Sequence, residues 1–338
     1  MREIVIPKGG APDVLTIREV SEPAPGPGEV RIRVRTAGVN FADIMARMGL
    51  YPDAPPMPCV VGYEVAGDVD ALGEGVTEFQ VGERVLALTR FGGYSDAVVV
   101  PAQQAAAMPD TLSYEKGAAI PVNYLTAWLM LVRLGNVRAG DQVLVHAAAG
   151  GVGQAALQIC LARGADVIGT ASAGKHERLR SLGVAHCVDY RNDDFEAAVA
   201  QITGGRGVDI VLDAVGGKSL RKSYRSLAPM GRLFAFGASS LAPSTRRKLI
   251  PALRGLLSMP RFGAVEMMND NRGVFGVNLG HLWGEQSALR AMLGEVLAGV
   301  NAGDLDPVVD RTFPFTEAAA AHGYIQARKN FGKIILTA

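Results

Sequence analysis

A glycine-rich turn is the segment of this sequence whose residue types and spacing most clearly suit chemistry. The run VLVHAAAGGVG carries small residues at the spacing Ala148-x-Gly150-x-x-Gly153. The mostly apolar segment Gln142–His146 predicts a buried strand before the turn, and Val152–Leu161 predicts a helix after it. A strand, a tight turn and a helix N-terminus in this order bring backbone N–H groups close to a pyrophosphate. The pattern therefore predicts a dinucleotide site, and an ordinary glycine-rich turn is the alternative.

The next strand–turn segment bears on which dinucleotide would bind. It reads GTASAGK (169–175) and lacks the Asp or Glu that accepts hydrogen bonds from a ribose 2′-hydroxyl. Ser172 can donate to a phosphate oxygen and Lys175 can neutralise it. Tyr190 and Arg191, after the following predicted strand, can close the same pocket. The pattern favours NADPH over NADH; the alternative is a lysine that only solvates the start of a helix.

The elements that must position these residues are of two kinds. The first third of the 338 residues is rich in valine, glycine and proline, and Glu29–Thr36 alternates charged and apolar residues as a half-buried strand does. Similar short strands are expected at Val61–Val69, Glu83–Leu88 and Ala97–Val100. Because Gly/Pro turns separate them, this region is expected to form a small barrel or sandwich of antiparallel strands.

From Tyr114 to about Trp283, strand patterns alternate with helical patterns. This rhythm predicts right-handed βαβ units around a parallel sheet. The expected strands are Gln142–His146, Asp166–Thr170, His186–Asp189, Val208–Asp213 and Arg232–Phe236.

The segment Leu241–Arg272 interrupts this rhythm and is too long for a simple connecting loop. A strand at Gly273–Val277, a helix at Glu285–Val300 and a strand at Gly332–Leu336 are expected to follow it. We expect this C-terminal tail to return to the first domain.

Composition argues against several classes of function. The net charge of +1 gives no support for binding of nucleic acid or of an anionic membrane surface. Cys59, Cys160 and Cys187 are far apart, so we expect reduced thiols in a cytoplasmic protein rather than a disulfide framework or a structural zinc site. The N-terminal segment lacks the apolar core of a signal peptide. The apolar window Gly117–Val132 is expected to be too short and too polar to span a bilayer.

The ordered motifs of the whole chain resemble those of the medium-chain dehydrogenase/reductase superfamily, in its zinc-free quinone oxidoreductase (zeta-crystallin) group. The carrying motifs are AGVNFAD (37–43), GYEVAG (62–67), the glycine-rich turn, DAVGG (213–217) and GKIIL (332–336). Within that group the chain is most similar to the vesicle amine transport protein homologues, through PVNYLTAW (121–128), GTASAGKHE (169–177), LAPMG (227–231) and GVNLGHL (276–282). The resemblance implies a Rossmann NADPH-binding domain at 123–286. It also implies a mainly β GroES-like catalytic domain at 1–122 and 287–338.

The resemblance also bears on metal use. Zinc alcohol dehydrogenases of this superfamily carry a cysteine and a histidine ligand where this chain has Asn40 and Tyr63. Since both ligand types are lost, no bound metal is expected. The resemblance then implies NADPH-dependent transfer of a hydride to a small-molecule quinone or α,β-unsaturated carbonyl, because such acceptors take a hydride directly.

Individual site residues follow from the same resemblance. Tyr51 and Asn40 are the expected catalytic residues, through hydrogen bonds to the acceptor. The expected cofactor-binding residues are Asn40, Thr126, Ala149, Gly150, Gly151, Val152, Gly153, Ser172, Lys175, Tyr190, Val215, Phe236, Gly237, Ala238, Asn278, Leu279 and Asn330. Asp43 is expected to order its loop, and Tyr63 is either a cleft residue or a core aromatic.

Two further features have plain structural interpretations. His146 ends a predicted buried strand and is expected to be a satisfied core histidine, and no Ser–His–Asp arrangement follows from the sequence. The basic segment Thr245–Phe262 is either a helix pair that covers the cleft or binds lipid, or a packed helical excursion with solvated arginines. We favour the second.

Two other functions stay open. One is an NADPH-binding interaction protein with little catalysis. The other is an enoyl-thioester reductase, for which Arg246, Arg247 and Lys248 would line the path of a phosphate-bearing carrier. In either case relatives in the superfamily suggest a homodimer, and the predicted strand Gly273–Val277 is the candidate edge for pairing.

Overall fold

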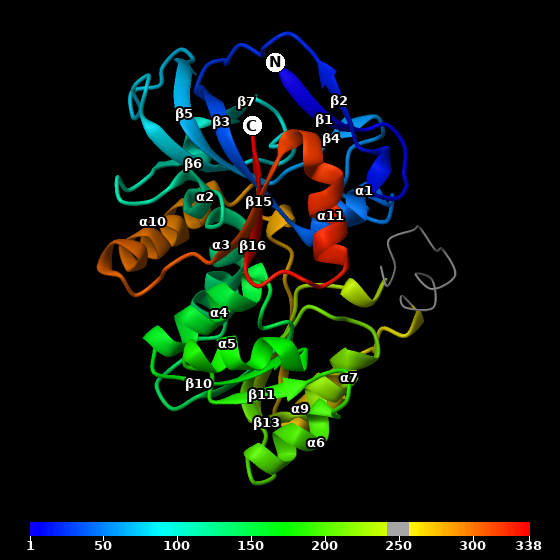
Figure 1. Cartoon of the computed structure of the whole chain (residues 1–338). Coiled ribbons are helices and arrows are strands. Elements are labelled where there is room, and N and C mark those ends of the chain that lie inside the picture. Colours follow the sequence, from blue (N-terminus) through cyan, green and yellow to red (C-terminus); the bar gives the residue numbers. More distant parts are fainter. Residues whose placement is uncertain (242–256) are drawn as a thin grey trace.

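Two β-sheets of different kinds organise the computed structural model, which describes residues 1–241 and 257–338. Figure 1 shows a lower lobe built around one sheet and an upper lobe that contains both chain termini. The red C-terminal strands lie beside the blue N-terminal strands in the upper lobe. The fold is that of the predicted class, with a Rossmann-like domain and a GroES-like domain.

The lower lobe contains a six-stranded parallel sheet in the order β11-β10-β9-β12-β13-β14. Its strands are β9 (Gln142–Val145), β10 (Asp166–Ala171), β11 (His186–Asp189), β12 (Val208–Asp213), β13 (Leu227–Ala235) and β14 (Gly273–Gly276). This confirms the predicted parallel βαβ sheet. The strand order reverses between β9 and β12, and ligands bind at the carboxyl ends of the strands at such a point.

The upper lobe contains a seven-stranded sheet in the order β15-β16-β3-β5-β6-β8, with β7 also paired to β3. Its strands are β3 (Glu29–Val39), β5 (Glu64–Leu72), β6 (Arg84–Leu88), β7 (Ala97–Pro101), β8 (Ala105–Ala107), β15 (Val309–Pro314) and β16 (Lys333–Thr337). A small separate sheet joins β1 (Arg2–Ile6), β2 (Thr16–Glu19) and β4 (Cys59–Val60).

The C-terminal tail returns to the first lobe as predicted, because β16 pairs antiparallel with β3. The antiparallel strands predicted for the first third of the chain are confirmed. The tail adds a parallel pair that was not predicted, because β15 pairs parallel with β16. The sequence shows little sign of β15, because half of its residues are exposed and it lacks a regular apolar alternation. The exact domain boundaries, at 122/123 and 286/287, stay predictions.

The predicted strand Val61–Val69 is wrong at its start. β4 ends at Val60 and β5 begins only at Glu64, because Gly62 has a φ of 102° that interrupts an extended strand. A Cβ on Gly62 would lie 2.7 Å from the ring of Tyr94. Glycine therefore permits both the turn and the close approach of Tyr94.

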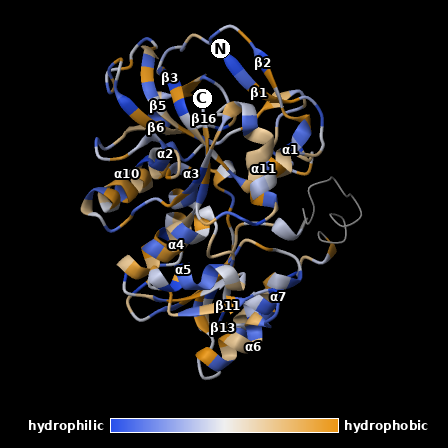
Figure 2. Cartoon of the chain, in the orientation of Figure 1, coloured by the Kyte–Doolittle hydropathy of each residue, from blue (hydrophilic) through white to orange (hydrophobic). Residues whose placement is uncertain are grey.

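Helices cover both sheets and fill the space between the lobes. They are α1 (Phe41–Arg47), α2 (Tyr114–Gly117), α3 (Pro121–Trp128), α4 (Gly151–Ala162), α5 (His176–Ser181), α6 (Phe195–Ile202), α7 (Lys218–Arg225), α9 (Ala264–Asp270), α10 (Gln286–Ala302) and α11 (Ala318–Gln326). Figure 2 shows hydrophobic and hydrophilic residues alternating along α4, α6 and α10, as is typical of helices that bury one face. Residues 242–256, which include Arg246, Arg247 and Lys248, lie outside the described part of the chain.

The apolar segment that contains α3 is longer than the expected window Gly117–Val132. The run Tyr114–Leu134 is long and apolar enough to cross a membrane by length and composition, which the window Gly117–Val132 alone did not indicate. However, 72% of its apolar window is buried inside the protein, and α3 packs against both α4 and α10. The apolar run is therefore used as core between the lobes.

Candidate functional site

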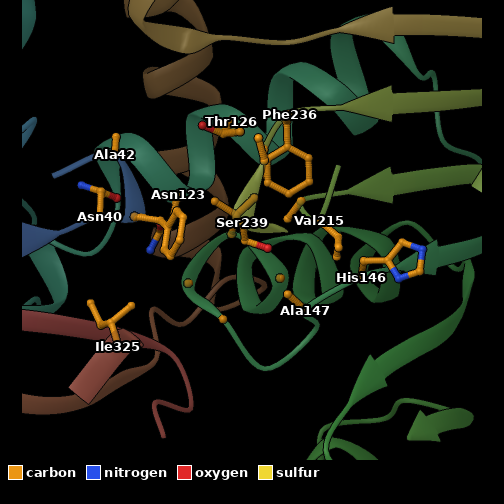
Figure 3. Close-up of a pocket in the computed structure, with 18 of the residues that line it drawn as sticks. Asn40, Ala42, Asn123, Thr126, His146, Ala147, Val215, Phe236, Ser239 and Ile325 are labelled. Carbon is orange, nitrogen blue, oxygen red and sulfur yellow. The ribbon is translucent and has the colours of Figure 1, made fainter. Parts of the chain in front are cut away.

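A cavity of about 1300 Å³ opens between the two lobes at the carboxyl ends of the parallel strands. All the catalytic and cofactor-binding residues expected from the sequence line it, from Asn40 and Tyr51 through Lys175 to Asn330. Figure 3 shows Asn40 at one end and His146 at the other, with Thr126 and Phe236 between them. The fold thus brings these side chains to one site, while the role of each stays a prediction.

The glycine-rich turn lies against this cavity in the geometry that its sequence predicts. Ala147 has a φ of 52°, and α4 begins after Gly150, which provides no side-chain cap. The first N–H groups of a helix have no acceptor within the helix, so those of α4 are available to an anion. A Cβ on Gly153 would lie 2.4 Å from the Ala147 carbonyl oxygen, and one on Gly151 would lie 2.5 Å from Nδ2 of Asn123. Both glycines are needed for the close packing of α4, and the uncapped helix end fits a pyrophosphate.

Cationic and hydroxyl groups gather at another part of the cavity wall. Lys175 Nζ donates to the carbonyl oxygens of Arg328 (2.9 Å) and Asn330 (2.6 Å), and burial lowers its pKa. Arg328 donates from Nη1 to the hydroxyl of Tyr190 at 3.3 Å. Although burial raises the pKa of this hydroxyl, hydrogen bonds from Arg328 and Arg191 outweigh it and lower the pKa overall. These groups, with Ser172 beside them on the wall, fit a terminal phosphate.

Arg328 is a site residue that the sequence analysis missed. It lines the cavity and follows α11 with a φ of 55°. Its one sequence signal is the basic run ARKN (327–330), which immediately precedes the GKIIL motif. Nothing in that run indicates that it meets the segment after β10, more than 150 residues earlier.

The end of β12 is ordered by a buried carboxylate. Asp213 Oδ1 accepts hydrogen bonds from the backbone N–H groups of Val215 (2.8 Å) and Gly216 (3.0 Å). Its Oδ2 accepts from the hydroxyl of Ser223 at 2.8 Å. This explains how Val215, one of the expected cofactor-binding residues, is held in the cavity wall.

His146 is a satisfied core histidine, as predicted. Its Nδ1 lies 3.1 Å from Thr170 Oγ1 and its Nε2 lies 3.0 Å from Ser223 Oγ, and burial lowers its pKa. Although Asp213, Ser223 and His146 are neighbours, the serine lies between the other two and donates its proton to the carboxylate. Ser223 is fully buried, so this chain of hydrogen bonds is not a nucleophilic triad.

A buried polar cluster forms the floor of the cavity beneath Asn40. Asn40 Nδ2 donates to Glu64 Oε1 at 2.9 Å, and Lys333 Nζ donates to Asn40 Oδ1 at 2.6 Å. Lys333 also pairs directly with Glu64, and it lies 3.4 Å from Asn123 Oδ1. Glu64 is 0% exposed and Lys333 is 3% exposed. We call Glu64, Lys333, Asn40 and Asn123 the floor cluster; the sequence analysis identified only Asn40.

The backbone makes room for this cluster. A Cβ on Gly38 would lie 2.5 Å from Glu64 Oε1 and 2.7 Å from Lys333 Cε. The second carboxylate oxygen of Glu64 accepts from the Val122 N–H at 2.7 Å, at the start of α3. One carboxylate thus connects β5, β16 and the helix between the lobes. Because the Asn40 amide is held at both ends, only one of its N–H bonds remains for a ligand.

Asp43 orders its loop, as expected. It is fully buried and accepts hydrogen bonds from the N–H groups of Asn40 (2.8 Å) and Gly62 (3.0 Å) and from the Tyr94 hydroxyl (3.2 Å). Burial raises its pKa to about 7. These contacts fix Asn40 at the start of α1 and the turn that precedes Tyr63.

Tyrosines line the end of the cavity nearest the upper lobe. Tyr51 and Tyr63 both line it, and their rings meet edge to face with centroids 6.2 Å apart. Tyr63 is therefore a cleft residue that is also buried, at 7% exposure. Burial together with the charge of Asp53 raises the pKa of Tyr51, so its hydroxyl stays protonated at neutral pH.

Metal-ligating side chains do not gather at this site. Within the described part of the chain, no three His, Cys, Asp or Glu side chains lie together in a way that could hold a metal ion. Glu64, the acidic residue beside Asn40, forms an ion pair with Lys333. The cysteines Cys59, Cys160 and Cys187 are free thiols.

Comparison with known proteins places this geometry in a family. Residues 26–110 match the family model described as alcohol dehydrogenase GroES-like domain, and residues 182–336 match the one described as zinc-binding dehydrogenase. The synaptic vesicle membrane protein VAT-1 homolog of Rattus norvegicus is 42% identical over 323 residues, which cover 95% of this chain and 80% of that protein. The 2-haloacrylate reductase of Burkholderia sp is 38% identical, covering 98% of this chain and 97% of that protein.

Solved structures show the same relationship. The quinone oxidoreductase of Escherichia coli, solved in complex with NADPH, is 29% identical, with a TM-score of 0.89 over the full length of both chains. With both lobes matched by family models and the whole chain by oxidoreductase homologues, this chain belongs to the medium-chain dehydrogenase/reductase superfamily, among the relatives of the VAT-1 homologues and the quinone oxidoreductases.

Proposed function

We propose that this protein is an NADPH-dependent oxidoreductase that transfers a hydride to a quinone or an α,β-unsaturated carbonyl without zinc. One observation carries the proposal. A single cavity joins an uncapped helix N-terminus, a cationic wall and a tyrosine-lined end. The printed names of two homologues, a quinone oxidoreductase complexed with NADPH and a 2-haloacrylate reductase, agree with a reductase of conjugated acceptors.

The cofactor would lie along the cavity from the cationic wall to the floor cluster. The N–H groups at the start of α4 would hold the pyrophosphate. Lys175, Arg328 and the hydroxyls of Ser172 and Tyr190 would hold the 2′-phosphate, which only NADPH carries. Bound NADPH supplies the hydride and the two electrons of the reduction.

The residues of this chain would orient the acceptor and stabilise negative charge on its oxygen. Tyr51 keeps a protonated hydroxyl at the tyrosine-lined end, where it can donate a hydrogen bond or a proton to that oxygen. Asn40 can offer its one remaining N–H, and the floor cluster fixes the direction in which that N–H points. No part of this proposal needs a Lewis acid, because a conjugated carbonyl is already electrophilic at its β-carbon.

The first experiment is to measure NADPH consumption with an ortho-quinone, a para-quinone and a simple enone in parallel, with NADH as the control. We expect the parent protein to turn over faster with NADPH than with NADH. In the variant Lys175→Ala the two rates should become similar, because the cation that binds the 2′-phosphate is lost. Tyr51→Phe should lower kcat about 100-fold or more, the scale for loss of one donor to a developing oxyanion, with little change in the Kd for NADPH. Full activity of this variant would show that the role assigned to Tyr51 is wrong.

A binding protein with little catalysis is the second candidate, because the VAT-1 homologue is named as a synaptic vesicle membrane protein and its name states no reaction. Saturable NADPH binding with no turnover of any acceptor would favour it. An enoyl-thioester reductase would instead be favoured by turnover of an acyl-coenzyme A enoyl substrate. Its expected carrier path at Arg246, Arg247 and Lys248 lies outside the described residues.

We also propose that the protein forms a homodimer through β14. This strand is at an edge of the parallel sheet, and Phe275 on it is 36% exposed. An unpaired edge with an exposed aromatic residue can pair with a second copy. Light scattering of the purified protein should give twice the chain mass.

A further inference from the structure

A second chamber of about 370 Å³ opens beside the proposed hydride-transfer site. It shares Tyr51, Tyr63, Gly280 and Trp283 with the main cavity. Because the shared residues come from both lobes, the chamber begins where the acceptor would be reduced and continues between the lobes. It is thus placed to hold the part of an acceptor that extends beyond its reacting carbons.

Four aromatic side chains contribute to the walls of this side chamber. Tyr51, Tyr63, Phe91 and Trp283 line it. The Tyr63 and Phe91 rings are 5.2 Å apart and tilted, and Tyr51 meets Tyr63 edge-on. Ring edges and faces at such distances pack well against a flat conjugated group. A short aliphatic acceptor would leave these surfaces without contacts.

One charged side chain of the chamber, Arg90, has no ion-pair partner among the described residues. Asp53 Oδ2 accepts hydrogen bonds from His281 Nε2 (2.9 Å) and Asn278 Nδ2 (3.2 Å), so the chamber's carboxylate already has partners. In contrast, no carboxylate within residues 1–241 and 257–338 forms an ion pair with Arg90, which lies on the chamber wall with an exposed side chain. An arginine that faces a pocket without a partner is suited to a ligand carboxylate.

The neck between the two cavities also holds an unmatched donor. The Tyr63 hydroxyl is buried and makes no hydrogen bond of good geometry among the described residues, although the Tyr51 hydroxyl lies close enough to interact with it. Burial and the nearby charge of Asp43 raise its pKa well above the usual range, so it stays an O–H donor. A buried donor without a partner is unusual in a folded protein, and a ligand oxygen in the neck would satisfy it.

We propose that the acceptor is a flat conjugated carbonyl compound that carries a carboxylate, with its carbonyl oxygen bound by Tyr63 and its carboxylate bound by Arg90. This inference rests on the proposed function for the identity of the reacting group. In the reaction, hydride adds to the β-carbon and the π electrons move to the carbonyl oxygen. Tyr63 stabilises that oxygen beside Tyr51, and a proton from water then completes the saturated product at the α-carbon.

The experiment compares two acceptors that differ in one charge, 4-(4-carboxyphenyl)but-3-en-2-one and its methyl ester. We expect kcat/KM to favour the acid about fivefold to tenfold, the scale of one partly exposed charge-assisted hydrogen bond. Arg90→Ala should abolish this preference by raising KM for the acid alone. Arg133→Ala removes an exposed arginine outside both cavities and should leave the preference unchanged.

A binding measurement separates this inference from the proposed function. The saturated analogue 4-(4-carboxyphenyl)butan-2-one has no carbon–carbon double bond to reduce. Calorimetry gives its Kd for the NADPH-loaded protein. Arg90-dependent binding of this acid, together with no turnover of the unsaturated acid or its methyl ester, would support the chamber and contradict the proposed reaction. Equal Kd values for the acid and its methyl ester, or an unchanged Kd in Arg90→Ala, would overturn the chamber even if quinones are reduced.

Tyr63→Phe tests the second contact. We expect kcat to fall about 100-fold or more for acid and ester alike. The thermal midpoint should fall little, because among the described residues the hydroxyl that is removed makes no hydrogen bond of good geometry. Unchanged kcat with both acceptors would exclude Tyr63 from the site.

Discussion

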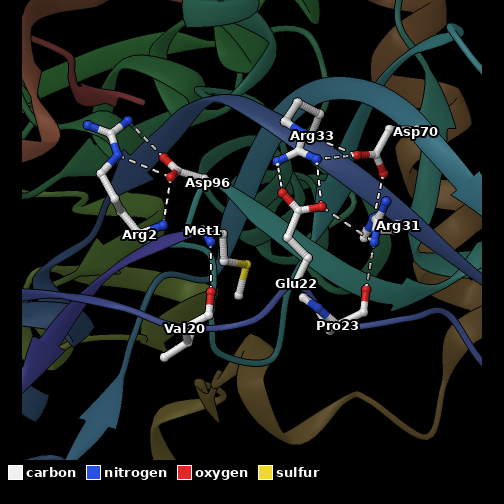
Figure 4. Close-up of polar contacts among 9 residues, drawn as sticks. All are labelled: Met1, Arg2, Val20, Glu22, Pro23, Arg31, Arg33, Asp70 and Asp96. Carbon is white, nitrogen blue, oxygen red and sulfur yellow. Dashed lines mark hydrogen bonds and ion pairs between the residues drawn. The ribbon is translucent and has the colours of Figure 1, made fainter.

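The same pair of strands carries two polar clusters that differ in nearly every physical respect. Where β3 begins and β5 ends, Arg31 and Arg33 pair with Glu22 and Asp70, as Figure 4 shows. Where β3 ends and β5 begins, Asn40 and Glu64 meet Lys333 in the floor cluster. Side chains of the first cluster are 19% to 37% exposed, whereas the Glu64–Lys333 pair is nearly inaccessible.

The difference shows that the number of ion pairs says little about their importance. Exposed pairs are screened by water and salt, so each contributes little to stability. A buried pair gains little over an apolar pair of the same shape, but removal of one partner leaves an unpaired charge in a medium that solvates it poorly. The floor cluster is therefore the place where one substitution should affect both stability and the site.

The largest effect is expected for Lys333→Met. It leaves the fully buried Glu64 carboxylate without its cation, and such a loss lowers the free energy of unfolding by about 3–5 kcal/mol. Chemical denaturation at neutral pH measures it. The same variant should weaken NADPH binding, because Asn40 and Asn123 lose a shared donor on the cavity floor.

The double variant Glu64→Gln with Lys333→Met sharpens this prediction. With the unpaired charge also removed, a large part of the stability should return. If the double variant is as unstable as the sum of the two single variants, the clusters do not differ in the way we describe.

The next effect concerns pH and a buried hydrogen-bonded chain that continues from Asn40. Asp43 binds the Tyr94 hydroxyl, which lies 3.2 Å from His322 Nε2, and Arg47 Nη1 lies 3.2 Å from His322 Nδ1. Burial, with the charge of Arg47, lowers the pKa of His322 to about 3. Burial raises the pKa of Asp43 to about 7, although the hydrogen bonds that its carboxylate accepts lower the pKa.

The two shifts have opposite consequences in acid. An unfolded histidine binds a proton below about pH 6.5 while folded His322 does not, so its contribution to stability is lost as the pH falls toward 3. Folded Asp43 binds a proton below about pH 7 while the unfolded residue does not until about 3.8, so its contribution grows as the pH falls. Between about pH 4 and 6.5 the two nearly cancel.

His322→Gln should reveal this compensation. As the pH falls from 6.5 to 4, the free energy of unfolding of this variant should rise relative to that of the parent protein. The rise should be about 1.4 kcal/mol for each pH unit, the value for one proton. Asp43→Asn should show the opposite trend. Denaturation curves at four pH values measure both slopes, and a difference between the two variants that does not change with pH would contradict the assignment.

The smallest effect is expected in the exposed cluster. Arg33→Ala removes contacts to Glu22 and Asp70, yet the thermal midpoint should fall by less than about 2 °C. The small loss should also shrink when salt is raised to about 1 M, where screening extends over only a few ångströms. A loss as large as that of Lys333→Met would remove the contrast between the clusters.

The parts of the fold that follow from local patterns were predicted well. His186–Asp189 and Val208–Asp213 have the predicted bounds. Val208–Asp213 is the clearer case, because a central strand of a parallel sheet is buried on both faces and is mostly apolar. The break at Gly62 and the parallel strand β15 were not predicted. The first depends on the ring of Tyr94 and the second on pairing with β16, and neither partner is adjacent in sequence.

Some residues of the candidate site could likewise be predicted from the sequence, and others could not. The residues that line the cavity could be named because their motifs are short and ordered, as the glycine-rich turn illustrates. Glu64 and Lys333 lie in the quoted motifs GYEVAG and GKIIL, but a buried pair formed by residues so far apart has no local signature. The same holds for Arg328, whose role depends on a contact with the segments after β10 and β11.

By itself, the sequence determined the class of fold and the phosphate-binding turn, because strand burial and glycine requirements act over a few neighbouring residues. The tertiary structure alone decided which charges are buried together and which face a cavity without a partner. Solvation and pairing of a charge depend on everything within a few ångströms of it, and the chain reaches those neighbours only by folding. The buried Glu64–Lys333 ion pair and Arg90, which forms no ion pair with the described residues, are the two outcomes of that rule in this protein.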